Sequence, residues 1–490
     1  MRIAVLADLH LTACRTSVKL DVLEWLSNEL RACHPDLVVA IGDLTALGTE
    51  DQSRRMCAFL NSTDLPWCST PGNAEFRTSA ELASPWYVAP PPGAPVLLVD
   101  SANYDPPAKD LQEMAALPDG AGVLLATHVP PSAWPEEARR ALSAAQERQA
   151  IAAVIAGHQH DDGSDRLRGL DPDKSAGGPP MFEIWDNGTG SWHRTPVEMT
   201  SADIRTWPLE ERQKLFAQFG VCTMWTTLEN IAEATRLRIP HLELREPALQ
   251  KLSEDTLLNA LDAWRRECGR TLSLHLSNLT VGDDGGALRL SAERALRLGC
   301  TRVTLHVPAV TAADFPHCQT ALLDNFLERM KPLLDSPVDI GIENLHTSPG
   351  RTADDQRNFG CTIGECRSWI ETLRQATGNS RIGFHFDIGH ARNNPPFNST
   401  ENLSDFYAEM GMLANGCHFH QVSPVRVEGD SGNHRPFTGL YEKMISLAGF
   451  FLAWRKGQFP LQPPIYLEIR GDGLGIQTYN TLRELIFSNH

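Results

Sequence analysis

The feature that most constrains the fold is an alternation of short apolar runs and amphipathic helices in the second half of the chain. Eight such runs follow one another, at Gly220–Trp225, His241–Arg245, Leu272–Leu276, Arg302–Val307, Asp339–Glu343, Ile382–Asp387, Gly416–Gln421 and Ile465–Ile469. Helical patterns follow most of them, one of them over Phe437–Trp454. Eight β/α units in about 270 residues match the size of a (β/α)8 TIM barrel. We therefore expect a closed parallel barrel.

The first half of the chain has a different pattern. Strands are predicted at Ile3–Ala7, Leu37–Ile41, Val96–Val99, Val123–Ala126 and Ile151–Ala156. Helices over Val18–Cys33 and Pro135–Gln149 alternate with some of them, which is typical of an α/β sandwich. Because the sequence becomes polar and helical over Thr200–Arg212, we expect a linker there. The predicted domains are residues 1–200 and 213–490, and both are of the α/β class.

Composition excludes several classes of protein. The chain has 490 residues, of which 42% are hydrophobic and 21% charged, as in globular proteins with full cores. The net charge of −17 disfavours non-specific binding to nucleic acids. No apolar run is long enough to span a membrane, and the N-terminus is too short and too soon charged for a signal peptide. The eleven irregularly spaced cysteines argue against a disulfide framework, so we expect a cytoplasmic protein.

Polar side chains follow the predicted strands of the first half, at the points where those strands end. Carboxylate, imidazole and amide ligands without thiolate suit Mn, Fe or Zn, and a two-metal site needs a bridging carboxylate. The expected ligands are Asp8, His10 and His160 for one metal and Asn73, His128 and His158 for the other. Asp43 is expected to bridge the two divalent ions.

Five segments of the first half, ADLHL, GDLTALG, PGNAEF, THVPP and GHQH, resemble the motifs of the calcineurin-like metallophosphoesterases. The resemblance is greatest to the class III cyclic-nucleotide phosphodiesterase branch and covers roughly residues 1–195. It implies that the same seven residues are metal ligands, and that Asp43 and His128 belong to the catalytic site.

One position departs from that family, because Ala74 stands where the family has a histidine. The resemblance implies that this histidine orients the phosphate and helps to protonate the leaving oxygen, which alanine cannot do. Two explanations fit: the natural motif has degenerated, or an original histidine has been replaced, which the intact flanking residues favour. In either case metal binding should survive while turnover suffers.

A second group of potential ligands follows the predicted barrel strands. It comprises His275, His306, Glu343, Asp387, His420 and Glu468 at six strand ends, with His390 and His434 in the loops that follow. Burying several carboxylates without partners is costly, so cations are implied. His346, His385 and His418 are expected to pack or to support ligands. His418 and His420 point the same way along one strand, so only the one nearer the strand end should bind metal directly.

The segments TLHVPA, GIENLH, FHFDIGHA, CHFHQV and YLEIRG resemble the xylose isomerase-like TIM barrels, over about residues 215–485. That group includes sugar isomerases and epimerases and the endonuclease IV-type AP endonucleases. The resemblance to the epimerases implies one divalent metal on Glu343, Asp387, His420 and Glu468, with both glutamates exchanging protons.

The endonuclease branch uses a larger ligand set for three zinc ions, and His275, His306, His390 and His434 match its additional histidines. In that interpretation Glu343 bridges metals. An aspartate of that branch, expected two residues before His434, is Gly432 here. The barrel is therefore expected to hold one to three Zn or Mn ions, with one or two favoured over the full set.

Together the two patterns predict a bifunctional metal-dependent enzyme acting on a small phosphorylated sugar or nucleotide. The first domain is expected to hydrolyse a phosphodiester or phosphomonoester, and the barrel to act on the same substrate or on the product. Three alternatives stay open: a sugar isomerase or epimerase in the barrel, a nucleic-acid repair or defence nuclease, and an inactive regulatory module in one domain. The acidic charge disfavours the nuclease, and no membrane partner is expected.

Overall fold

The computed structural model describes the chain except residues 79–85, 188–191, 225–226, 250–251, 283–285, 348–352, 354–355, 424–431 and 489–490. The residues cluster into two compact units. Unit 1 comprises Met1–Asp203 and Tyr441–Leu452, and unit 2 comprises Ile204–Leu440 and Ala453–His490. The division near residue 203 falls within the predicted linker, while the predicted domain boundaries themselves stay a prediction. No helix in the described part of the chain is long and apolar enough to cross a membrane.

Unit 1 contains two sheets that share a core. The five-stranded sheet has the order β3-β2-β1-β7-β8, and the three-stranded sheet has the order β4-β5-β6. Their bounds are β1 Arg2–Leu6, β2 Leu37–Ile41, β3 Trp67–Thr70, β7 Met181–Asp186, β8 His193–Glu198, β4 Val96–Val99, β5 Val123–Thr127 and β6 Ile151–Ala156. One cluster of buried side chains joins Ile3 and Val39 of the first sheet to Leu98 and Ala126 of the second. This confirms the predicted α/β sandwich.

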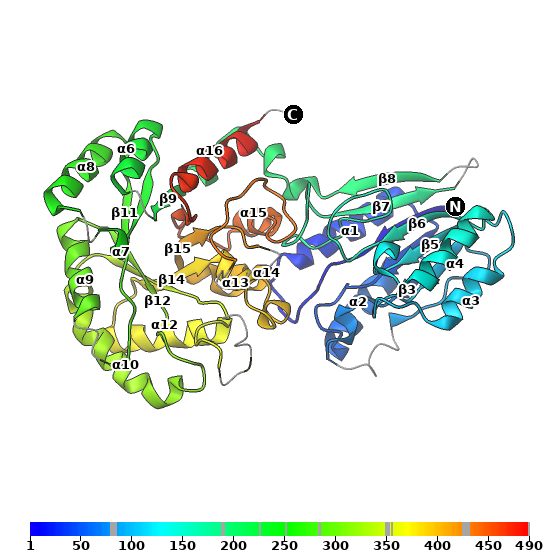
Figure 1. Ribbon diagram of the computed structural model, residues 1–490, viewed down its shortest axis with the longest axis horizontal. Helices are drawn as coiled ribbons and strands as arrows, with labels where there is room; N and C mark the ends of the chain where they lie inside the picture. The colour runs from blue at the N-terminus through cyan, green and yellow to red at the C-terminus, as the bar shows by residue number, and fades with distance from the viewer. Residues whose placement is uncertain are drawn as a thin grey trace. The chain divides into compact units, whose positions relative to one another are not determined.

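Helices cover the outer faces of these sheets. They are α1 Lys19–Cys33, α2 Glu50–Asn61, α3 Ala108–Ala116 and α4 Glu136–Glu147. Met114 of α3 and Leu142 of α4 pack with Val99 and Leu125 of the smaller sheet, and Figure 1 shows both helices beside it. Strands β7 and β8 were not predicted. The reason is clearest for β8, an edge strand that is mostly exposed and contains Pro196, so it lacks the apolar pattern of a buried strand.

Unit 2 is a closed barrel of eight parallel strands in the order β10-β11-β12-β13-β14-β15-β16-β9. The bounds are β9 Phe219–Thr223, β10 His241–Arg245, β11 Thr271–His275, β12 Arg302–His306, β13 Asp339–Glu343, β14 Ile382–Asp387, β15 Ala414–Phe419 and β16 Ile465–Leu467. Each of the eight predicted runs coincides with one of these strands to within two residues, except that Trp225 lies outside the described residues. The predicted (β/α)8 barrel is confirmed.

Helices surround the barrel strands, as Figure 1 shows for α6, α8, α9, α10 and α12. The helices of this part of the chain are α5 Leu209–Phe216, α6 Thr227–Leu237, α7 Glu246–Leu249, α8 Glu254–Glu267, α9 Ala287–Arg297, α10 Phe315–Arg329, α11 Lys331–Leu334, α12 Ile363–Thr377, α13 Ile388–Arg392, α14 Leu403–Met410, α15 Ala448–Arg455 and α16 Leu474–Phe487. The helices thus form an outer layer around the barrel strands.

The helix predicted over Phe437–Trp454 is wrong in its first half, because only α15 forms there. The preceding backbone bonds to loops of unit 1 instead of closing helical turns. The Tyr441 carbonyl accepts from the Gly177 N–H at 3.0 Å, and the Ser446 N–H donates to the Asp173 carbonyl at 2.9 Å. The apolar side chains that suggested a helix are buried in this irregular segment, Ile445 completely so.

Candidate metal centres

The unit 1 site is built on strand ends with unusual backbone geometry. Five of the seven predicted ligands have a left-handed backbone, with φ of 55° at Asp8, 50° at His10, 49° at Asp43, 67° at His158 and 53° at His160. Non-glycine residues rarely adopt this conformation, and such strain concentrates at functional sites. The left-handed backbone conformation is energetically unfavourable at these five residues, and it sets the directions of their side chains.

The first predicted ligand group is brought together in unit 1. His10 Nε2 lies 3.3 Å from His160 Nε2, and His160 Nε2 lies 3.9 Å from Asp8 Oδ1. The His158 N–H donates to Asp8 Oδ2 at 2.9 Å, which fixes that carboxylate. A Cβ on Gly157 would lie 2.5 Å from Asp8 Oδ2, so this close approach requires glycine. One imidazole pair and one carboxylate thus face a common point.

The second group forms a similar cluster. His128 Nε2 lies 3.1 Å from Asn73 Oδ1 and 3.2 Å from His158 Nδ1. The outer nitrogens of both histidines are engaged elsewhere: His128 Nδ1 donates to the Ile41 carbonyl at 3.0 Å, and His158 Nε2 lies 3.0 Å from the Tyr104 hydroxyl. Burial lowers the pKa of His128 and of His158 to about 4, so both imidazoles are neutral at pH 7, as metal ligands must be.

Asp43 lies between the two groups, and each of its carboxylate oxygens faces one of them. Its Oδ2 is 3.7 Å from His10 Nε2, and its Oδ1 is 3.4 Å from His128 Nε2. The Ala74 N–H donates to Oδ1 at 2.7 Å. A Cβ on Gly72 would lie 2.3 Å from the same oxygen, which explains the glycine before Asn73. Asp43 thus faces both ligand groups, and its role as a bridge stays a prediction.

Glu75 is a buried residue of this site that the sequence analysis missed. Its Oε2 accepts from the Asp43 N–H and from the Gly72 N–H, both at 2.8 Å, and its Oε1 accepts from the Thr45 N–H at 2.9 Å. Burial and the Asp43 charge raise the pKa of Glu75 to about 6. Glu75 therefore connects, through hydrogen bonds, the two loops that carry Asp43 and Asn73. Its place directly after the Gly-Asn-Ala run was the available signal.

Ala74 lies in the interior of this site. It is fully buried, and it begins a short 3-10 helix over Ala74–Phe76. Its backbone still serves the site through the hydrogen bond to Asp43, while its methyl side chain has no group that could contact a phosphate.

In the barrel, the Glu343 carboxylate at the end of β13 lies between two groups of histidines, as the Asp43 carboxylate lies between two ligand groups in unit 1. Its Oε2 lies 3.0 Å from His275 Nε2 and 3.5 Å from His306 Nε2. Its Oε1 lies 3.5 Å from His390 Nδ1 and 3.2 Å from His418 Nδ1. The two oxygens thus face different groups of histidines.

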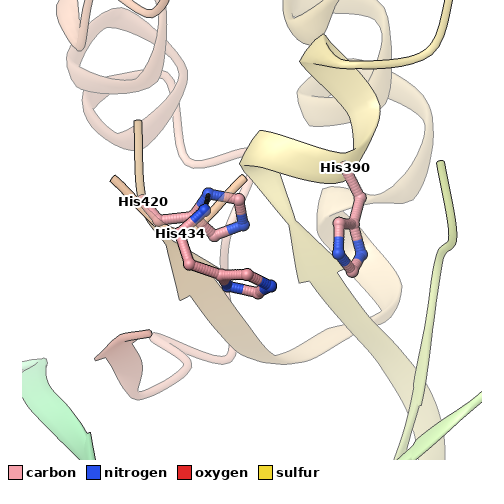
Figure 2. A group of neighbouring side chains, drawn as sticks. All are labelled: His390, His420 and His434. Carbon is pink, nitrogen blue, oxygen red and sulfur yellow. Dashed lines mark hydrogen bonds between the residues drawn. The ribbon is translucent and has the colours of Figure 1, made fainter. Parts of the chain in front are cut away.

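The other predicted barrel ligands adjoin this group. His420 Nε2 lies 3.0 Å from Asp387 Oδ1, and His434 Nδ1 lies 3.3 Å from Glu468 Oε2. Figure 2 shows the rings of His420 and His434 close together, with His390 reaching toward the same space from α13. All eight predicted residues are therefore brought together at one end of the barrel strands.

His418 contacts two of the carboxylates of this centre. Its Nδ1 contacts both Glu343 and Glu468, the latter at 3.2 Å from Oε2, while its Nε2 is bonded to Glu243. Burial disfavours the charged form, but the carboxylates of Glu468, Glu243 and Glu343 outweigh it and raise the pKa of His418 well above its usual value. His385 and His346 lie beside the centre, where the Arg302 guanidinium donates to His385 Nδ1 at 3.0 Å.

Two charged residues on β10 were also missed. Glu243 is fully buried and accepts hydrogen bonds from the Ser273 hydroxyl at 2.7 Å and the Thr304 hydroxyl at 2.6 Å. Arg245 pairs with Glu468. A glutamate in the middle of an otherwise buried strand was the signal, because a charge there requires partners.

Both sites fit divalent cations by the chemistry of their donors. Imidazole nitrogens and carboxylate oxygens converge within 4.8 Å in three groups of predicted ligands, Asp8–His10–His160, Asp43–His128–His158 and His275–His306–Glu343. A fourth such group is formed by His390, His420 and His434.

One family model matches part of the chain. Residues 1–162 match the calcineurin-like phosphoesterase family, which confirms the resemblance predicted for the first half. A search of curated proteins finds no match.

Three solved structures are similar to parts of the chain. A D-tagatose 3-epimerase-like protein is 16% identical with a TM-score of 0.38, covering 55% of this chain and 96% of its own. Endonuclease IV from Thermus thermophilus is 16% identical with a TM-score of 0.37, covering 55% of this chain and 98% of its own. A dimetal phosphatase from Danio rerio is 16% identical with a TM-score of 0.31, covering 40% of this chain and 97% of its own.

Proposed function

We propose that the chain is a bifunctional metal-dependent enzyme. Unit 1 hydrolyses a phosphodiester or phosphomonoester of a small sugar or nucleotide, and the barrel acts on the same substrate or on the product. The observation that carries this proposal is the Asp43 carboxylate, whose two oxygens each face one of two separate ligand groups. A bridging carboxylate of this kind is what a two-metal phosphoesterase requires.

The residues of unit 1 are arranged to hold two divalent ions, Mn, Fe or Zn. Such a pair, when bound, polarises a phosphoryl oxygen and activates water for in-line attack. Asp43 would fix the separation of the pair, and the hydrogen bonds to Ala74 and Glu75 hold Asp43 in place. The side chains of Asp8 and His128 are fully buried, while those of Asn73 and His158 are partly exposed. Ala74 offers no proton to the leaving oxygen, so turnover is expected to be slower by about 10²–10⁴ than with a general acid.

For the barrel, the geometry favours a hydrolase with more than one ion over a one-ion epimerase. A one-ion epimerase would use four ligands, namely Glu343, Asp387, His420 and Glu468. His275 and His306 would bind no metal in such an enzyme. Both histidines address Glu343 Oε2, while Oε1 faces His390 and His418. Glu343 is therefore proposed to bridge two ions, with Zn or Mn as the candidates. Gly432 adds no side-chain donor, which argues against the full three-ion set.

A reducing compartment is also part of the proposal. All eleven cysteines are free thiols, which suits a cytoplasmic enzyme. A small phosphorylated substrate is favoured over nucleic acid, because a chain with a net charge of −17 repels a polyanion.

Two measurements on the full chain test these assignments. The first is hydrolysis of a chromogenic phosphodiester and a chromogenic phosphomonoester with Mn²⁺, comparing the chain with Asp43→Asn and with Asp119→Asn, an exposed carboxylate. Activity that Asp43→Asn removes and Asp119→Asn keeps is expected. Equal activity in all three proteins would place hydrolysis outside this site.

The second measurement is the number of Zn or Mn ions bound per chain. Changing both His275 and His306 to alanine should lower that number by at least one, while alanine at the exposed His317 should not change it. An unchanged metal count in the double variant would favour the one-ion epimerase instead. The same variants then separate the activities, because a barrel hydrolase should lose its activity and an epimerase should keep most of it.

A further inference from the structure

The chain connecting β15 and β16 of the barrel contributes residues Tyr441–Leu452 to unit 1. We propose that Lys443, carried on this segment, binds the substrate phosphate at the two-metal site of unit 1. The proposal rests on the phosphoesterase function proposed above and names a residue outside the family motifs that would complete it. It also gives the barrel sequence a direct part in the specificity of the other unit.

The segment is anchored on both sides of Lys443. On one side, the Tyr441 carbonyl accepts from the Gly177 N–H, and the Tyr441 hydroxyl donates to Asp203 Oδ1 at 2.9 Å. On the other side, Ser446 bonds to the loop carbonyl of Asp173. The backbone that carries Lys443 is therefore fixed in unit 1, while its side chain is exposed.

The side chain of Lys443 contacts the loop that carries two of the predicted metal ligands. Its Nζ donates to Gln159 Oε1 at 2.5 Å, and Gln159 is the residue between His158 and His160. His158 belongs to one ligand group and His160 to the other, so the ammonium lies next to the loop that supplies both.

An exposed ammonium beside this loop suits an anionic substrate. An ammonium has three donor hydrogens, so Lys443 can keep or exchange its bond to Gln159 and donate to a phosphate oxygen. The site has a need for such a donor, because Ala74 cannot orient the phosphate. Two other cations of unit 1 are already engaged elsewhere, since Arg77 donates to the Ala46 carbonyl at 2.9 Å and Lys174 Nζ lies 3.9 Å from Asp171 Oδ2. Among these three cations, Lys443 alone comes from the barrel half of the sequence.

Phosphate binding by the full-length chain loaded with Mn²⁺ tests the proposal, with inorganic phosphate as the probe and calorimetry as the readout. Only the binding that Asp43→Asn removes is assigned to unit 1, since the barrel can also bind phosphate. Lys443→Met should weaken that component about tenfold to a hundredfold, the usual value of a hydrogen bond to a charged group. Lys443→Arg should recover most of the affinity, and Lys109→Met, which removes an exposed lysine on α3, should change nothing.

Two further readouts separate the possible outcomes. The affinity of the metal-free chain for Mn²⁺ should be the same with Lys443→Met as without it, because Lys443 is proposed to contact phosphate and no metal. Wild-type phosphate affinity in Lys443→Met would overturn the role of Lys443 while leaving the phosphoesterase proposal intact. If Asp43→Asn, made as a single change, binds phosphate as strongly as the original chain does, the proposed function and the role of Lys443 fail together.

Discussion

The Glu243 carboxylate accepts a hydrogen bond from His418 inside the barrel, at a place where both side chains are fully buried. The other ring nitrogen of His418 lies 3.2 Å from Glu343 Oε1 and 3.2 Å from Glu468 Oε2. His418 thus connects a carboxylate below the candidate metal centre to two carboxylates within it. Residues in this position orient the ligands of a metal site.

Replacement of Glu243 by alanine is expected to destabilise the barrel by about 3–5 kcal/mol, since removing one member of a buried ion pair leaves the other charge uncompensated. Ser273 and Thr304 would lose an acceptor as well. Urea unfolding of the metal-free chain measures the effect, with alanine at the exposed Glu371 of α12 as the control. A loss as small as that of the control would show that His418 is neutral and carries no charge to compensate.

Divalent metal is expected to stabilise the folded chain. Glu343, Asp387 and Glu468 are all fully buried, and bound cations would compensate their charges. A ligand at 100 times its dissociation constant adds about 2.7 kcal/mol to the free energy of unfolding. The melting temperature of the metal-free chain should therefore rise with added Zn²⁺ or Mn²⁺, and by less in Asp43→Asn and in Glu343→Gln. A melting temperature independent of metal would contradict both metal centres.

Restoring the family histidine should restore catalysis in unit 1. We expect Ala74→His to raise diester hydrolysis with Mn²⁺ by a hundredfold or more, on the order of the contribution of a general acid. The backbone N–H of residue 74 that bonds to Asp43 is kept in this variant. The same substitution should leave the number of bound metal ions unchanged. No gain in rate would mean that the natural substrate is not a simple diester or that the unit 1 site no longer turns over substrate.

The strand ends show how much of the site could be predicted from the sequence. Asp43 follows a buried apolar run of unit 1, and Glu343 ends one in the barrel. Parallel strands bring their carboxyl ends to one edge, so linear order was enough to place each carboxylate with the other candidate ligands of its own unit. Glu243 could not be found this way, because it lies within a strand and its role depends on a histidine from another strand. Lys443 was out of reach for a different reason. Its segment was predicted to be helical, and only tertiary hydrogen bonds to unit 1 reveal where it lies.

A pH dependence of stability is expected from His241, which lies on β10 away from the candidate ligands. Burial lowers the pKa of His241 to about 4, and its Nε2 donates to the Ala217 carbonyl at 3.0 Å. The folded pKa lies below the unfolded value of about 6.5, so the unfolded chain binds the proton more readily. The contribution of His241 to the free energy of unfolding is therefore fully present above pH 6.5, and it is lost as the pH falls toward 4.

The size of this effect follows from the shift, at about 1.36 kcal/mol per pKa unit, and amounts to about 3 kcal/mol at most. Replacing His241 by glutamine, which keeps a donor but does not titrate, should flatten the stability profile between pH 6.5 and pH 4 relative to the unchanged chain. Urea unfolding at a series of pH values measures the difference between the two proteins. Parallel profiles would show that His241 is protonated equally in the folded and unfolded states.

Unit 1 is built from two separate stretches of the chain, so a fragment that contains only the first stretch should be less stable. A fragment of residues 1–203 lacks Tyr441–Leu452 and so loses the hydrogen bonds made at Pro172, Asp173 and Gly177. Each such bond contributes about 0.5–1.5 kcal/mol, which is a large share of the stability of a domain. The fragment should therefore be cleaved by protease in the loop around residues 172–177 faster than the full chain is, and a peptide of residues 441–452 should slow that cleavage. Equal resistance without the peptide would show that the segment only rests on a unit that is complete without it.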